Sequence, residues 1–295
     1  MVEKTVTKRF LSHRIGTFIG DLSGSATGKM IIIGIIMILF FLFLAIFAPV
    51  ISPYSPIHRV GKAFLAPNLR FWFGTDNLGR DMLSRVIYGT RIALAISFLS
   101  VIMASVIGIP LGLIAGYVGK LFDRITTMVM DSIYAFPGLI LAIAIAAMLG
   151  PGVINISIAI TVVYVPTYYR VVRNQVTSLK NELFVEGARS IGAKNRTILS
   201  RYIFPSTFPS VVVIMAMNLA DAIMTEAGLS FLGLGIPPPT PDWGYDLNNG
   251  QRFLLQNDWW MVLFPGIAII LIVLGFSLVG EGLNEYLNPN IGERR

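Results

Sequence analysis

The chain has 295 residues, of which 55 % are hydrophobic and only 13 % charged, and its mean hydropathy is +0.72. Soluble domains carry about 25 % charged residues, so this composition excludes an ordinary soluble domain and predicts a polytopic, all-α membrane protein. The absence of cysteine excludes disulfides, thiolate metal sites and cysteine nucleophiles, and the net charge of +7 must be interpreted from where the basic residues lie.

Six apolar runs follow one another along the chain. The first, residues 30–50, carries no charge, and its 21 residues reach about 31 Å, enough to cross a hydrocarbon core about 30 Å thick. Backbone groups in lipid need internal hydrogen-bond partners, and the alternation of a barrel strand is absent, so about six transmembrane helices are expected. The other five predicted spans are 92–117, 133–149, 153–169, 208–229 and 260–280.

The basic residues predict the orientation in the membrane. Of the 23 lysines and arginines, 16 fall in the segments 1–29, 117–132, 170–202 and 284–295, which lie on one side of a six-span topology. The positive-inside rule places these segments, and both termini, in the cytoplasm. Because the charge accounts for topology, no nucleic-acid partner is expected. Residues 30–50 are also too long for the core of a cleavable signal peptide.

Two other motifs are weak. Residues 23–30 have the outline of a phosphate-binding loop, but Ser23 stands where its first glycine belongs and Met30 follows the lysine, so they are interpreted as a polar linker. His13 and His58 fall on opposite sides of the predicted topology and cannot share a metal or a proton relay. No metal site and no catalytic residue are predicted.

The extracytoplasmic stretch before the second span is rich in charged and aromatic residues. Thr75 or Asp76 could cap a short helix there, and Arg80, Asp81 and Arg85 could pair along one of its faces. A solvated cap over the helices and a substrate-facing role remain equally open for this stretch.

The most informative segment is the polar loop 184–206, FVEGARSIGAKNRTILSRYIFPS, between the fourth and fifth spans. A glycine in a helical pattern predicts a bend, so we expect two short amphipathic helices hinged at Gly192. Asn195 is expected to cap the second helix, and Pro205 suits the first turn of the next span. The alternative is an amphipathic loop that rests on the lipid headgroups.

This loop resembles the EAA motif of ABC-importer permeases. The resemblance implies that it is a coupling helix, which inserts into a cleft of a separate ATPase subunit. The matching positions are Glu186, Ala188, Gly192 and Pro205, whereas Gly187, Tyr202 and Phe204 depart from the motif.

Residues 73–94 and 226–244 are similar to the C-type permease subunit of dipeptide and oligopeptide importers. The resemblance implies a type I importer permease (MetI-like) fold with a core domain at 92–283, a loop at 51–91 and a tail at 284–295. It also implies a non-catalytic pore subunit in a bacterial or archaeal cytoplasmic membrane, which moves peptides by alternating access. Expected partners are a B-type permease, two ATP-binding subunits that hold ATP and Mg²⁺, and an extracytoplasmic substrate-binding protein. This chain would bind no cofactor, and its substrate could instead be a nickel chelate, glutathione or an oligosaccharide.

Polar groups in the predicted spans suggest a transport path. Asn218 and Asp221 lie one turn apart in the fifth span and are the best pathway candidates, since a buried charge in a membrane is costly. No series of ionisable residues crosses the bilayer, which argues against a proton-driven carrier, and no cluster suits a membrane enzyme. Glycines recur in the second span at a spacing that allows close helix packing, either within this chain or against a partner permease. They are Gly108, Gly112, Gly116 and Gly119.

Overall fold

The computed structural model of the chain describes residues 25–287, and every regular element in that range is helical. The expectations for residues 1–24, which include His13, and for 288–295 fall outside the described residues. The elements are α2 (Ala26–Ile51), α3 (Met82–Val118), α4 (Lys120–Tyr134), α5 (Gly138–Leu149), α6 (Val153–Leu179), α7 (Leu183–Ser190), α8 (Asn195–Thr197), the π-helix η1 (Ile198–Ile203), α9 (Phe204–Phe231), α10 (Trp243–Gln251), η2 (Leu254–Gln256) and α11 (Trp260–Leu287).

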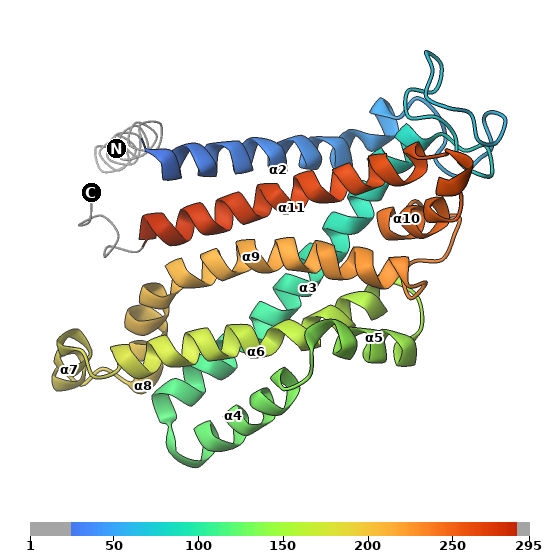
Figure 1. The fold of residues 1–295 in the computed structure, drawn as a ribbon. Helices are drawn as coiled ribbons and strands as arrows, with labels where there is room; N and C mark the ends of the chain where they lie inside the picture. The colour runs from blue at the N-terminus through green and yellow to red at the C-terminus, as the bar shows by residue number, and fades with distance from the viewer. Residues whose placement is uncertain (1–24, 288–295) are drawn as a thin grey trace.

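The long helices form one bundle (Figure 1). Helices α2, α11, α9 and α6 lie side by side in that order, and α3 crosses them obliquely while packing most extensively against α6. Helix α7 and the start of α8 lie at one end of the bundle, called here the α7 end. Helix α10 and the loop 52–81 lie at the opposite end, called the α10 end.

Four helical stretches of the described chain are long and apolar enough to cross a membrane, namely Ala26–Ile51, Met82–Val118, Asn195–Phe231 and Trp260–Leu287. The pair α4–α5 is a fifth if its two halves form one span. Helix α6 has 27 residues, enough for a bilayer, and carries buried tyrosines between its neighbours. This arrangement is consistent with the predicted all-α membrane protein of about six spans.

The prediction that the third span is one helix was wrong. Instead of one helix over residues 133–149, α4 ends at Tyr134 and α5 begins at Gly138, and the two are bent by 88°. Pro137 causes the break, because it restricts Phe136 and cannot donate to the preceding helical turn. The 12 residues of α5 cover only about 18 Å, too short for a full span.

The second span begins ten residues earlier than the predicted position 92. Asp81 caps α3, because its Oδ2 accepts hydrogen bonds from the Ser84 amide (2.8 Å) and hydroxyl (2.6 Å). The predicted cap at Thr75 or Asp76 was therefore wrong. The expected polar linker 23–30 was also wrong over its described part, since Ser25 caps α2 by accepting from the Gly28 amide at 3.0 Å.

The glycine spacing in α3 serves packing within this chain. An added Cβ at Gly108, Gly112 or Gly116 would lie 2.6–2.8 Å from backbone oxygens of α6. Such contacts are sterically excluded, so glycine at these positions is what allows α3 and α6 to approach closely. Gly119 is different, because a Cβ added there would meet nothing within 4 Å; its φ of +67° ends the helix.

Candidate functional site

The loop 184–206 is built around a glycine turn. Helix α7 ends at Ser190, and Gly192 follows with a φ of +82°, which glycine adopts readily. The Ala193 amide donates to the Ala188 carbonyl at 3.0 Å and the Gly192 amide to the Arg189 carbonyl at 2.9 Å, the pattern of a Schellman cap. The chain therefore bends at Gly192, where the sequence predicted it.

The segment after this turn differs from the prediction. Residues 195–231 form one continuous helical stretch through α8, η1 and α9, not a second short helix. Asn195 is not the cap: Lys194 holds that position, and the Asn195 Oδ1 accepts from the Tyr117 hydroxyl at 2.8 Å. Pro205 lies in the first turn of α9, as expected, directly after the π-helical residues, where a proline cannot donate to the preceding turn.

Helix α7 is anchored by one apolar face. Val185 and Ala188 are buried in a small cluster that joins α7 to α6, η1 and α9. Because well-packed apolar side chains resist displacement, this cluster fixes α7 to the ends of two long helices. The other buried members are Val172, Val176, Ile198, Ile203 and Val211.

No element within residues 25–287 covers the opposite face of α7. Leu183 is 83 % exposed and Ile191, just after the helix, is 80 % exposed, although both side chains are large and apolar. Glu186 is exposed, and its carboxylate makes no hydrogen bond or ion pair within residues 25–287. A Cβ added at Gly187 would meet nothing within 4 Å. The exposed residues Leu183, Glu186, Gly187 and Ile191 are called the α7 surface below.

The two predicted pathway residues differ in their exposure. Asn218 is buried beside the Tyr168 hydroxyl of α6. Asp221, one turn further along α9, is exposed. Next to it, the hydroxyls of Tyr164 and Thr225 lie 3.3 Å apart. Polar groups of α6 and α9 thus form a strip that includes the exposed carboxylate of Asp221.

Two ion pairs join α4 to α6. Arg173 binds Asp123 through both carboxylate oxygens. Arg170 pairs with Asp131 at 2.6 Å and lies 3.9 Å from the centre of the Tyr134 ring. These contacts stabilise the bent α4 against the bundle, and Asp123, Asp131 and Arg173 line an open cavity beside it.

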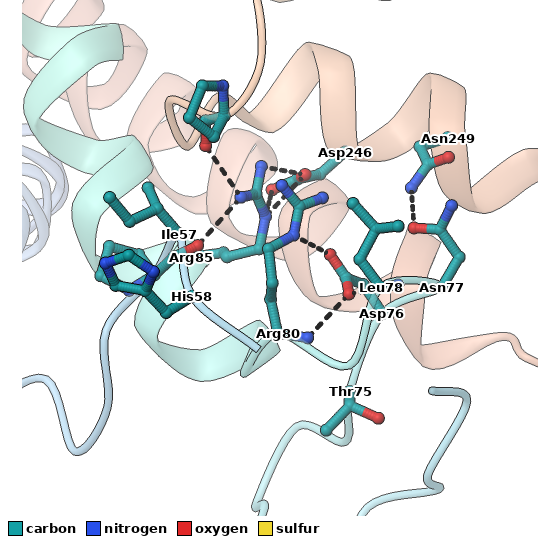
Figure 2. A network of polar contacts seen from close by, with 12 residues as sticks. Ile57, His58, Thr75, Asp76, Asn77, Leu78, Arg80, Arg85, Asp246 and Asn249 are labelled. Carbon is teal, nitrogen blue, oxygen red and sulfur yellow. Dashed lines mark hydrogen bonds and ion pairs between the residues drawn. The ribbon is translucent and has the colours of Figure 1, made fainter. Parts of the chain in front are cut away.

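A buried polar network closes the α10 end (Figure 2). The Arg85 guanidinium donates to Asp246 Oδ1 through Nε (2.9 Å) and Nη2 (2.6 Å), and its Nη1 donates to the Pro56 and Pro239 carbonyls at 3.0 and 3.3 Å. One arginine therefore joins α3 to α10, to the loop 52–81 and to the loop 232–242 between α9 and α10. Burial raises the pKa of Asp246 more than the neighbouring Arg85 lowers it.

The remaining pairs of this network lie within and beside the loop 52–81. Arg80 Nε lies 2.5 Å from Asp76 Oδ2, and the Asn249 amide donates to Asn77 at 2.8 Å. The prediction that Arg80, Asp81 and Arg85 pair with one another was wrong, because Arg80 pairs with Asp76 and Asp81 caps α3 instead. Nothing in the sequence indicated Asp246, which is 161 residues from its partner Arg85. The sequence offered one indication that Arg85 needs a partner, because this charged residue lies among the apolar residues at the start of α3.

With this geometry in view, comparisons with known proteins identify the family. Residues 108–293, which include the α7 surface, match the family described as "Binding-protein-dependent transport system inner membrane component". The chain belongs to this family. Residues 28–67 match a second model, the "N-terminal TM domain of oligopeptide transport permease C". The chain is thus a membrane component of a transport system, as the resemblance implied.

Individual members of this family resemble the chain over most of its length. It is 41 % identical over 265 residues to the "Dipeptide transport system permease protein DppC" of Alkalihalophilus pseudofirmus, which covers 89 % of this chain and 86 % of that protein. It is 42 % identical over 258 residues to the "Glutathione transport system permease protein GsiD" of Escherichia coli O157:H7, which covers 87 % and 85 %.

A solved structure shows the same fold. An inward-facing form of the MetNI methionine ABC transporter superposes with a TM-score of 0.55 at 19 % identity, covering 70 % of this chain and 98 % of that one. The expected type I importer permease (MetI-like) fold is therefore confirmed.

Proposed function

We propose that this chain is one of two permease subunits of an ATP-driven importer that moves short peptides across a cytoplasmic membrane by alternating access. It carries no catalytic residue and binds no cofactor. Two separate ATP-binding subunits hold ATP and Mg²⁺, hydrolyse the nucleotide and move the permease through the loop 184–206. The α7 end faces the cytoplasm in this arrangement, together with both termini.

The observation that carries this proposal is the α7 surface. An exposed apolar face on a water-facing element usually indicates a docking site, and Leu183 and Ile191 provide such a face beside the open carboxylate of Glu186. The buried side, with Ala188, transmits any movement of α7 to α6 and α9. Gly192 fixes the direction of the chain after α7, and Pro205 fixes it at the start of α9. Gly187 leaves room for a close partner.

Short peptides are the proposed substrate because of the relatives named above. One is named for dipeptides and another for glutathione, which is itself a tripeptide. Selection among peptides is assigned to an extracytoplasmic substrate-binding protein that docks at the α10 end. The buried network of Arg85 and Asp246 gives this docking face a rigid base.

The second permease subunit is proposed to be a related B-type chain, which together with this one encloses the path. Asp221 supports a position on that path. An exposed carboxylate within a span is costly in lipid, so water, substrate or a protein group must face it in the assembly. Asn218, which is buried next to Tyr168, belongs to the same polar strip.

Crosslinking tests the proposal directly, because the chain has no native cysteine. In membranes that contain the whole complex, Leu183→Cys should crosslink to the ATP-binding subunit. The matched control is Leu255→Cys at the α10 end, which is fully exposed (102 %) and should not crosslink to it. Crosslinks from Leu183→Cys to lipid alone, in a complex that still transports, would reject the docking role.

A further inference from the structure

An apolar cavity of about 730 Å³ lies at the α10 end, outside the α7 surface and the α6–α9 polar strip. Its size falls in the range of small-molecule sites, about 300–1,000 Å³. Three spans form its walls: α2 contributes Phe40 and Leu44, α3 contributes Val86, and α11 contributes Phe264 and Leu271.

The cavity is elongated along the helices. Ile51 is the last residue of α2 and Phe40 precedes it by eleven residues, so the wall reaches about 16 Å along the helix from the α10 end at 1.5 Å per residue. Leu271 is the same number of residues into α11, which begins at Trp260 at that end. Since half of a hydrocarbon core is about 15 Å, the cavity extends from the membrane surface to near the midplane.

The cavity opens on the outer side of the bundle. Phe40 and Ile267 both line it, and both are exposed on the described chain. Helix α2 is the least buried of the candidate spans, with only 17 % of its most apolar window buried. A surface of this kind faces lipid unless another protein covers it.

The end of the cavity nearest the membrane surface is polar and carries both signs of charge. Arg70 is exposed, with its guanidinium 5.2 Å from the centre of the Phe71 ring, and Trp72 beside it is exposed as interfacial tryptophans are. Asp81 also lines the cavity and is only 1 % exposed. Its Oδ2 caps α3, but its Oδ1 has no hydrogen-bond partner within residues 25–287.

We propose that this cavity binds one phospholipid with a primary-amine headgroup, its acyl chain lying between α2 and α11, its phosphate at Arg70 and its ammonium at Asp81. Arginine binds phosphate through planar, charge-assisted hydrogen bonds. A buried carboxylate oxygen without a partner is costly, and an ammonium supplies both the charge and the donor that Asp81 needs. The apolar depth and the paired charges match the two ends of one lipid.

The test uses the assembled complex, purified in detergent and offered phosphatidylethanolamine, phosphatidylglycerol or phosphatidylcholine, with lipid retention measured by native mass spectrometry. Phosphatidylethanolamine should be retained in preference to the other two. Ile267→Trp fills the cavity and should lower its retention about tenfold, the effect of losing about two buried methylene groups. Ile270→Trp, on the same helix but outside the cavity and 64 % exposed, should leave retention unchanged.

A second variant tests the headgroup. Asp81→Asn keeps a side-chain oxygen for the α3 cap but removes the charge, so the preference for phosphatidylethanolamine should disappear while the complex stays folded. Equal retention of all three lipids by the unaltered complex would overturn the proposal, and so would an undiminished retention in Ile267→Trp. An Ile267→Cys crosslink to the sister permease would also overturn it, because a protein helix would then occupy the cavity.

Discussion

The pairing of Arg85 with Asp246 is the strongest single-residue constraint at the α10 end. Both side chains are buried, so removing one leaves an uncompensated charge, at a cost of about 3–5 kcal/mol. Asp246→Leu should therefore lower the thermal unfolding temperature and the abundance of the complex. The double variant Arg85→Met/Asp246→Leu should recover much of that loss, since it replaces the pair by apolar groups. A single variant as stable as the unaltered complex would contradict this role.

Gly192 should matter for coupling and not for insertion. Nothing lies within 4 Å of a Cβ added there, but a valine at its φ of +82° would be strained by about 1–2 kcal/mol and would redirect α7. Gly192→Val should insert normally and hydrolyse ATP without proportional peptide uptake, as measured in membrane vesicles. Gly150→Val is the matched control, because Gly150 has a φ of +79° and equally open surroundings but lies outside the loop 184–206, so this variant should transport normally. Normal uptake by Gly192→Val at normal abundance would count against the coupling role.

At the scale of elements, the contact between α3 and α6 holds the bundle together. Gly112→Ala would place a Cβ 2.6 Å from the Tyr169 carbonyl, so these helices would have to separate. We expect the variant to be destabilised by about 1–3 kcal/mol, measured by thermal unfolding of the purified complex. Gly228→Ala is the matched control, because its Cβ would lie 3.7 Å from the nearest atom. Equal stability of the two variants would show that the close approach is unimportant.

The sequence predicted these elements well wherever the signal is local. Val153 and Trp260 begin α6 and α11 at the predicted positions, because apolar runs resume there after polar or glycine-rich residues. The turn at Gly192 was predicted because glycine is needed for its backbone conformation. The bend between α4 and α5 was missed, although Pro137 indicated it, because the hydropathy of the run continues across the break.

What the sequence could not provide were contacts between distant parts of the chain. The partner of Arg85 lies 161 residues away, and no local pattern connects the two. The burial of Asn218 and the exposure of Asp221 likewise depend on where α6 packs against α9. The motif predicted Glu186 and Gly187 of the α7 surface, but the exposed Leu183 and Ile191 and the apolar anchor to α6 became visible only in three dimensions.

At the scale of the whole molecule, the two ends of the bundle have different structures. The α10 end is tied by buried charged pairs, whereas the α7 end presents a small anchored helix with an open apolar face. Long helices connect the two ends, so a displacement of α7 can reach the α6–α9 strip near Asp221 without passing through a flexible linker (Figure 1). This arrangement suits a subunit that is moved by another protein.

Peptide uptake into proteoliposomes is the most direct test of this account. The chain should be reconstituted alone, then with its sister permease, and then with the ATP-binding subunits and the substrate-binding protein. We predict uptake only in the complete assembly, and only with ATP present on the side of the α7 end. Peptide uptake by this chain alone, driven by an ion gradient in the absence of ATP, would contradict the central claim.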